Sequence, residues 1–385
     1  METPFIFGKI ASGGEFTDRE RETDHLIRNF QGGINTILIS PRRWGKSSLV
    51  NKASAIAGKK YKKIVFCFLD LYTIRTEEEF YNELTRQLLK STASKLAEII
   101  DNSRKFLGRF LPKITYSTEQ IAEFSIGLDW NEVKKHPEEI LNLAEKIAVE
   151  KKIKIVVCID EFQNISEFDN PLSFQKKVRA YWQKHKNVSY CLYGSKRHML
   201  MEVFASSSMP FYKFGDIIFL QKIKEADWQS FIVKRYADTG KKITEEHALL
   251  IARLVDCHPY YVQQLAQQAW LRTVKVCNKA IVEESFDSIV MQLSMLFQTM
   301  TDSLSTTHVK FLKALLEGVE QLSSKETLSK YNLGTSANVL KIKQALINKE
   351  IIDIQGSDIT FLDPVYRIWL QKYYFKIANN KTSNI

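Results

Sequence analysis

A glycine-lysine-serine turn between an apolar run and a helix is the feature that most restricts how this chain can fold. The apolar run is Ile34–Ile39, and the residues from Lys46 to Ala57 have the pattern of a helix that Gly58 would end. A turn of this kind aims successive backbone N–H groups and a helix N-terminus at one point, which makes a nest for phosphate oxygens. The sequence therefore predicts a phosphate-binding loop of the pattern G-x-x-x-x-G-K-[ST].

Each position of this loop has a physical task. Gly45 lets the backbone approach a phosphate without a Cβ, Lys46 reaches the β- and γ-phosphates, and the Ser47 hydroxyl is a hard oxygen suited to Mg²⁺. Ser40 stands where the pattern has its first glycine. We expect the loop to bind ATP or ADP with Mg²⁺. The predicted nucleotide-binding residues of the loop are Pro41, Arg42, Arg43, Trp44, Gly45, Lys46, Ser47 and Ser48.

Two adjacent carboxylates follow another apolar run. The run Ile155–Ile159 ends in Asp160 and Glu161, and Asp160 lies 160 − 46 = 114 residues after Lys46. At a strand end, Asp160 can hold Mg²⁺ through water, and Glu161 can take a proton from the attacking water. Together with the loop, this pair predicts ATP hydrolysis with Lys46 and Glu161 in catalytic roles.

The order of apolar runs and helical patterns predicts an α/β fold. Apolar runs without alternation, separated by helices, are typical of a parallel sheet that is buried on both faces. We also expect long helices at Glu77–Leu96 and Pro137–Lys151, an irregular stretch at Asn102–Tyr116, and a hairpin insert or exposed strand at Phe124–Trp130. The remaining predicted strands are Ile64–Leu71, Ile153–Ile159, Ser189–Tyr193 and Ile217–Leu220.

The pattern changes after the last strand and predicts three domains: a P-loop core at 1–220, a helical lid at 221–300 and a winged helix at 301–385. The expected lid helices are Glu225–Tyr236, Glu245–Val255, Pro259–Lys275 and Val282–Thr299. The expected winged helix has helices at Val309–Leu316, Ser323–Tyr331 and Ala337–Lys349, then a hairpin of Ile351–Ile354 and Ile359–Leu362, with Thr335 and Ser336 as cap candidates.

Charge and cysteine content limit the compartment and the partners. The net charge of +11 favours polyanions, and the densest basic run is Lys59, Lys60, Lys62 and Lys63, which also fits a solvated loop. No apolar run approaches the roughly 20 residues that cross a bilayer, so we expect no membrane partner. Five scattered cysteines favour a reduced, cytoplasmic location, with Cys67, Cys158 and Cys191 as small buried hydrophobes.

The Pro-Arg-Arg-x-Gly-Lys loop and the Ile-Asp-Glu-Phe-Gln strand end resemble those of AAA-type ATPases, in particular the STAND-like prokaryotic group, over Phe16 to about Lys372. The resemblance implies that Phe16–Glu22 and Pro259 lie by the adenine, and that Ser195 senses the γ-phosphate or the water. It also implies that Lys213 occupies the place of an arginine finger offered to a neighbouring subunit, in a homo-oligomer. A lysine there is a point charge without the planar fork of arginine.

Three functions remain open at this point. The chain can be a nucleotide-dependent switch that acts on a partner protein, a DNA-handling ATPase, or a nucleotide-binding scaffold with little turnover. In the second, Ala337–Lys349 would contact duplex DNA through Lys341, Lys343 and Lys349. The winged-helix region has 11 basic and 8 acidic residues, which is a modest excess for a nucleic-acid-binding domain.

Overall fold

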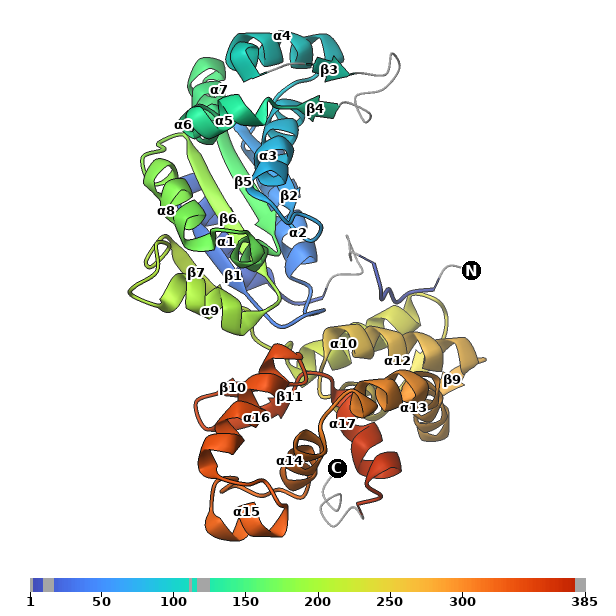
Figure 1. The fold of residues 1–385 in the computed structure, drawn as a ribbon. Coiled ribbons are helices and arrows are strands. Elements are labelled where there is room, and N and C mark those ends of the chain that lie inside the picture. The colour runs from blue at the N-terminus through green and yellow to red at the C-terminus, as the bar shows by residue number, and fades with distance from the viewer. Residues whose placement is uncertain (1–2, 10–16, 111–112, 116–124, 378–385) are drawn as a thin grey trace. The chain divides into compact units, whose positions relative to one another are not determined.

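The structure is a computed structural model that describes residues 3–9, 17–110, 113–115 and 125–377 of the chain (Figure 1). The chain forms two compact units. One comprises residues 10–221, and the other combines residues 1–9 with residues 222–385. In the part that the structure describes, no helix is long and apolar enough to cross a membrane.

A five-stranded parallel sheet forms the centre of the first unit. The strands are β1 (Thr36–Ile39), β2 (Ile64–Asp70), β5 (Lys154–Asp160), β6 (Val188–Gly194) and β7 (Asp216–Phe219). Their spatial order is β2-β5-β6-β1-β7, and every neighbouring pair is parallel. All carboxyl ends therefore meet at one edge of the sheet, and the predicted strands are confirmed.

Helices cover both faces of this sheet, as an apolar strand without alternation requires. Within β1, Ile37 and Ile39 belong to one buried apolar cluster and Leu38 to another. The Leu38 cluster takes residues of α1 (Glu20–Gly32) and α2 (Lys46–Lys60), and the other takes residues of α3 (Glu77–Ser91), α8 (Pro171–Trp182) and α9 (Arg197–Ala205). The α/β class with a parallel sheet is confirmed.

The prediction that Gly58 ends the second helix was wrong. α2 continues to Lys60, because Gly58 does not adopt the left-handed backbone that ends a helix. The cap residue is Tyr61, whose N–H donates to the Ala57 carbonyl at 2.7 Å. Lys59 and Lys60 lie in the last turn, where positive charge suits the helix dipole.

The predicted long helix Glu77–Leu96 is two helices, and the predicted irregular stretch after it is mostly helical. α3 ends at Ser91, where the Thr92 hydroxyl donates to the Leu88 carbonyl at 2.7 Å. α4 (Leu96–Leu107) then begins, with Glu98 accepting from the Ser94 N–H at 2.7 Å. Apolar periodicity continues across the break, so only these local side-chain bonds reveal it.

The rest of the insert between β2 and β5 consists of short helices and strands. After a 3₁₀ turn at Gly108–Phe110, β3 (Lys113–Thr115) pairs with β4 (Ser125–Gly127) as an antiparallel hairpin, which resolves the alternative left open for this region. α5 (Trp130–Lys135) follows. The predicted helix Pro137–Lys151 is α6 (Pro137–Leu141) and α7 (Leu143–Lys151), divided at Asn142, whose side-chain oxygen faces His185 Nε2 at 3.1 Å.

The helical part of the second unit agrees with its predicted elements. α10 (Glu225–Ala237), α11 (Glu245–Leu254), α12 (Pro259–Arg272) and α13 (Lys279–Asp302) are all present. Two strands of two residues each, β8 (Lys242–Ile243) and β9 (Val276–Cys277), form one small parallel pair that the sequence pattern did not predict. Strands this short carry no apolar pattern of their own.

A winged helix completes the chain. It consists of α14 (Thr306–Leu316), α15 (Lys325–Lys330), α16 (Ser336–Asn348) and the antiparallel hairpin of β10 (Ile352–Gln355) and β11 (Asp358–Phe361). Thr335 caps α16 through its hydroxyl, and Ser336 is the first helical residue. A further helix, α17 (Pro364–Trp369), was not predicted from the sequence; it is capped by Asp363 and followed by one π-helical turn, Leu370–Tyr374.

The first described residues pack within the second unit, although they precede the core in the sequence. Phe5 is fully buried in the same apolar cluster as Trp228 and Leu312. The Pro4 carbonyl accepts from Arg235 Nε at 2.7 Å. This cluster extends continuously from the helical part into the winged helix. The boundary at residue 300 between lid and winged helix therefore stays a prediction.

Candidate functional site

The phosphate-binding loop has the backbone that its sequence predicts. Gly45 has φ of 84°, in the left-handed region where a side chain is unfavourable, and α2 begins immediately after it. Lys46 is 7% exposed, whereas Arg42 and Arg43 are exposed. Ser40 is buried and its hydroxyl donates to the Pro41 carbonyl at 3.2 Å, so the residue in the glycine position satisfies its own polar atom.

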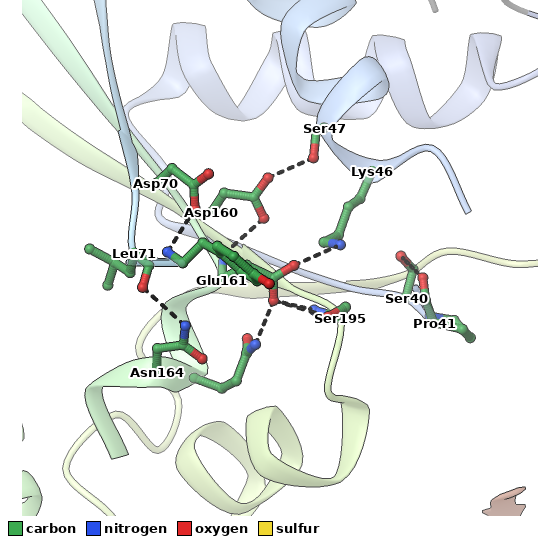
Figure 2. A network of polar contacts seen from close by, with 12 residues as sticks. Ser40, Pro41, Lys46, Ser47, Asp70, Leu71, Asp160, Glu161, Asn164 and Ser195 are labelled. Atoms are coloured by element: carbon green, nitrogen blue, oxygen red, sulfur yellow. Dashed lines mark hydrogen bonds and ion pairs between the residues drawn. The ribbon is translucent and has the colours of Figure 1, made fainter. Parts of the chain in front are cut away.

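The two carboxylates of the β5 end meet the loop (Figure 2). Ser47 Oγ donates to Asp160 Oδ2 at 2.6 Å, and Lys46 Nζ lies 3.4 Å from Glu161 Oε1. Asp160 Oδ1 also accepts the backbone N–H of Glu161 at 2.8 Å. Residues more than 110 positions apart in the sequence are thus in direct contact, because β5 and the strand before the loop end at the same edge of one sheet.

The second oxygen of Glu161 is held by Ser195, the residue after β6, and by Gln163. Glu161 Oε2 accepts from Ser195 Oγ at 3.0 Å, from the Ser195 N–H at 3.2 Å and from Gln163 Nε2 at 2.5 Å. The backbone of Glu161 is left-handed, with φ of 51°, which is uncommon for a residue with a side chain and turns this carboxylate toward the loop. Both carboxylate oxygens are therefore engaged.

The electrostatic environment separates the two carboxyls. Burial raises the pKa of Asp160 above its usual value, and the opposing effects of the Lys46 charge and the Ser47 hydrogen bond do not cancel it. Burial also acts to raise the pKa of Glu161. There the Lys46 charge and the hydrogen bonds from Gln163 and Ser195 outweigh burial, so that pKa lies below its usual value. Glu161 is the more strongly stabilised carboxylate of the pair.

Three residues of this site escaped the prediction of site residues. Gln163 is 1% exposed and orients Glu161, and Gly194 allows it to do so, because a Cβ on Gly194 would lie 1.9 Å from Gln163 Oε1. Asp70, at the end of β2, pairs in register with Asp160 and lies beside it in Figure 2. The signal that the sequence offered for Asp70 was a single acid near the end of the apolar run Ile64–Leu71.

We expect Gly194→Ala to slow ATP turnover by roughly tenfold or more, because the added methyl must displace the amide that positions Glu161. In a Gln163→Ala background the same methyl has no amide to displace, so it should add little to the loss. A double-mutant cycle on steady-state turnover measures this coupling. Fully additive losses would show that Gly194 acts independently of Gln163.

The remaining predicted site residues lie elsewhere on the loop or on other elements. Ser48 is buried on α2, and Trp44 is half-buried in the loop. Pro259 is the first residue of α12, in the second unit, as expected for a proline at a helix start. Lys213 is exposed with φ of 53°, and its ammonium group lies over the Tyr212 ring. Phe16 lies outside the described residues.

Comparison with known families assigns the chain to a family of ATPases. A family model described as an ATPase domain predominantly from Archaea matches residues 16–265, and a model for a winged helix domain matches residues 295–372. The first match spans well over half of the chain. The protein belongs to this archaeal-type ATPase family. No curated protein matches this ATPase in sequence.

Solved structures show the same fold. The ATPase is similar to a Walker-type ATPase of Pyrococcus abyssi, with 16% identity and a TM-score of 0.63 over 93% of this chain and 96% of that one. It is also similar to the ADP form of the ORC2 protein of Aeropyrum pernix, with 14% identity and a TM-score of 0.51 over 94% and 93% of the two chains. The predicted AAA-type P-loop core with a winged helix is confirmed, and the protein is a nucleotide-dependent ATPase. The narrower STAND assignment stays a prediction.

Proposed function

We propose that this ATPase is a nucleotide-dependent switch in which Lys46 binds the phosphates and Glu161 is the general base. The P-loop nest and the buried ammonium of Lys46 suit the β- and γ-phosphates. Glu161 takes a proton from the attacking water, the oxygen of that water bonds to the γ-phosphorus, and the bond to the bridging oxygen breaks with its electron pair on ADP. Ser195 holds Glu161 in place. The adenine role of Pro259, which the family resemblance implies, stays a prediction.

The donor set of the loop fits Mg²⁺. The Ser47 hydroxyl and the Asp160 carboxylate, 2.6 Å apart, are hard oxygen ligands that converge on one point. In the described residues no three His, Cys, Asp or Glu side chains cluster as a closed metal cage. Mg²⁺ usually takes one or two carboxylates and completes its shell with water and substrate phosphates. When bound, Mg²⁺ would neutralise phosphate charge.

The contact between Lys46 and Glu161 is the observation that supports a switch. The buried lysine lies 3.4 Å from Glu161 Oε1 and neutralises this carboxylate, and both Glu161 oxygens are engaged. Phosphates compete for the same ammonium group, so nucleotide binding frees Glu161 Oε1 for water. The Lys46–Glu161 ion pair thereby links nucleotide binding at the loop to the release of the general base. A scaffold with little turnover would not need such a link. Membership of an ATPase family also favours an enzyme over the scaffold.

The deciding experiment measures ATP turnover with and without duplex DNA, with molecular mass determined in the same samples. A switch that acts on a partner protein should turn over slowly and show no response to DNA. Stimulation by DNA would favour the DNA-handling hypothesis, and absence of turnover under every condition would contradict the proposed function. A mass that increases with ATP would support the homo-oligomer in which Lys213, exposed on the core, reaches a neighbouring nucleotide. The cytoplasmic location is supported by five free, buried cysteines.

A second candidate function, DNA handling, is favoured by the exposed side of α16. Lys341 on α16 and Lys349, the residue that follows its last turn, are exposed, and Lys343 is half-buried. None of the three has a carboxylate partner within the described residues. Leu340, 67% exposed on the same helix, instead suits contact with a protein. The helix thus presents both a phosphate-binding and an apolar feature.

If α16 contacts duplex DNA, neutralising three to four phosphates should give a log–log salt slope of about −3. Lys341→Ala combined with Lys343→Ala should then flatten the slope by about two. Fluorescence anisotropy of a labelled duplex over a salt series measures both slopes. Identical curves for parent and double variant would exclude α16 as the DNA-contacting helix and favour the partner-protein switch.

A further inference from the structure

Three connections rich in lysine enter the same edge of the sheet. Residues 59–63, 151–154 and 183–187 lead into β2, β5 and β6, and together they contain nine lysines, one histidine and no carboxylate. These three strands are neighbours in the sheet order. In the sequence the runs are about 90 and 30 residues apart, so only the topology brings them to one place.

Backbone contacts join the three connections directly. The Lys154 N–H donates to the Lys63 carbonyl at 2.8 Å, and the Ile155 N–H donates to the Asn187 carbonyl at 3.0 Å. Gln31, near the end of α1, links the first two further: its side chain accepts from the Tyr61 hydroxyl, and its carbonyl accepts from Lys154 Nζ.

Eight of these lysines are exposed, and we call them the lysine face. Neighbouring strands of a sheet lie about 4.8 Å apart, so the three connections bring these lysines to one region of the surface. The lysine face consists of Lys59, Lys60, Lys62, Lys63, Lys152, Lys154, Lys184 and Lys186.

Carboxylates near this face are engaged with other partners. Glu98 pairs with Lys151, Glu150 pairs with Lys105, and Glu145 accepts from the backbone and side chain of Asn187. In the part of the chain that the structure describes, no lysine of the face has a carboxylate within 4.0 Å. The positive charge of the face is therefore not neutralised locally.

We propose that the lysine face binds the phosphate backbone of duplex nucleic acid without reading its sequence. Ammonium groups are compact point charges that neutralise phosphates and lack the planar fork with which arginine recognises guanine. Protein interfaces are depleted in lysine and need aromatic or apolar anchors, whereas Tyr61 and Ile153, the apolar residues of these connections, are half-buried. Stabilisation of the α2 terminus accounts for Lys59 and Lys60 alone.

This surface is separate from the nucleotide site. The strands are parallel, and the arrows of β2, β5 and β6 in Figure 1 point in the same direction. The lysine-rich connections enter these strands at their starts, whereas Asp160 is the last residue of β5. β5 has seven residues, so the two edges are about 20 Å apart. Loss of nucleic-acid binding at this face should therefore leave basal ATP hydrolysis unchanged.

The test compares two triple variants of the full chain with equal charge change. The first is Lys62→Gln, Lys152→Gln and Lys186→Gln, one lysine from each connection. The matched control is Lys176→Gln, Lys234→Gln and Lys242→Gln, which are exposed lysines of α8, α10 and β8. Anisotropy of a labelled duplex of mixed sequence is recorded between about 50 and 200 mM salt, together with ATP turnover and melting temperature.

We expect the first triple to lose about tenfold or more in affinity at low salt and to flatten the salt slope by about two to three. The control triple should keep the parent slope, and both should keep parental turnover and melting temperature. Equal binding by the two triples would overturn the proposal, as would absence of duplex binding by the parent at every salt concentration. If the lysine face instead contacts an acidic protein, the parent should not bind duplex at any salt concentration. Loss confined to the Lys341 and Lys343 variant would assign the binding to α16.

Discussion

Lys46→Ala should abolish tight ATP binding. The lysine is buried at the start of α2 and is the only charged group that the loop brings inside, within the described residues. Truncating one partner of a desolvated charge pair costs about 2–5 kcal/mol, which is roughly 30-fold to several thousand-fold in affinity. Titration calorimetry with ATP and Mg²⁺ should show the binding heat disappear.

The control for this variant is Lys59→Ala, at the other end of the same helix, where the side chain is exposed. It should bind ATP as the parent does. Parental affinity in the Lys46 variant would move the phosphate site away from this loop. A melting temperature measured for both variants separates lost binding from lost folding, since Glu161 keeps its bonds to Ser195 and Gln163 when Lys46 is removed.

Glu161→Gln should retain nucleotide binding and slow hydrolysis by roughly 10²–10⁴-fold, the usual range for losing a general base. Affinity for ATP should stay equal or increase. In the parent, Lys46 must give up its ion pair with Glu161, 3.4 Å away, to bind phosphate, whereas the variant has no charge there to give up. Single-turnover hydrolysis with calorimetry on the same sample measures both quantities.

Glu202→Gln on α9 provides the matched control, since Glu202 is an exposed glutamate of the same core. Its turnover should equal that of the parent. If Glu161→Gln also turned over at the parental rate, another group would have to accept the proton. Asp70, which lies in register with Asp160, would be the next candidate.

Local sequence pattern predicted the elements whose signal lies within a few residues. The loop at Lys46, the acids at the end of β5 and the apolar runs that form the strands needed no knowledge of distant contacts. Asp160 and Glu161 then meet Lys46 and Ser47 because parallel strands share a carboxyl edge. The core of the candidate site was therefore predictable from two motifs and one rule of sheet geometry.

The features that escaped depend on contacts across the sheet or far along the chain. Gln163 matters because β6 places Gly194 beside it, and no residue near Gln163 in sequence signals that approach. The break between α3 and α4 depends on hydrogen bonds of Thr92 and Ser94 inside an uninterrupted apolar pattern. The assembly of the lysine face likewise required the strand order, which a list of basic runs does not contain.

The burial of Phe5 in the second unit has a consequence for the order in which the protein is made. The ring of Phe5 packs against that of Phe231, with centroids 6.1 Å apart, yet Phe231 is synthesised more than 200 residues after Phe5. At about 5–20 residues per second, this apolar segment waits roughly 10–40 s for its site. The ATPase core can fold first, while the second unit closes only when both ends of its chain are present. Nascent chains of this protein therefore carry an exposed apolar segment around Phe5, which chaperones can bind until translation passes Phe231.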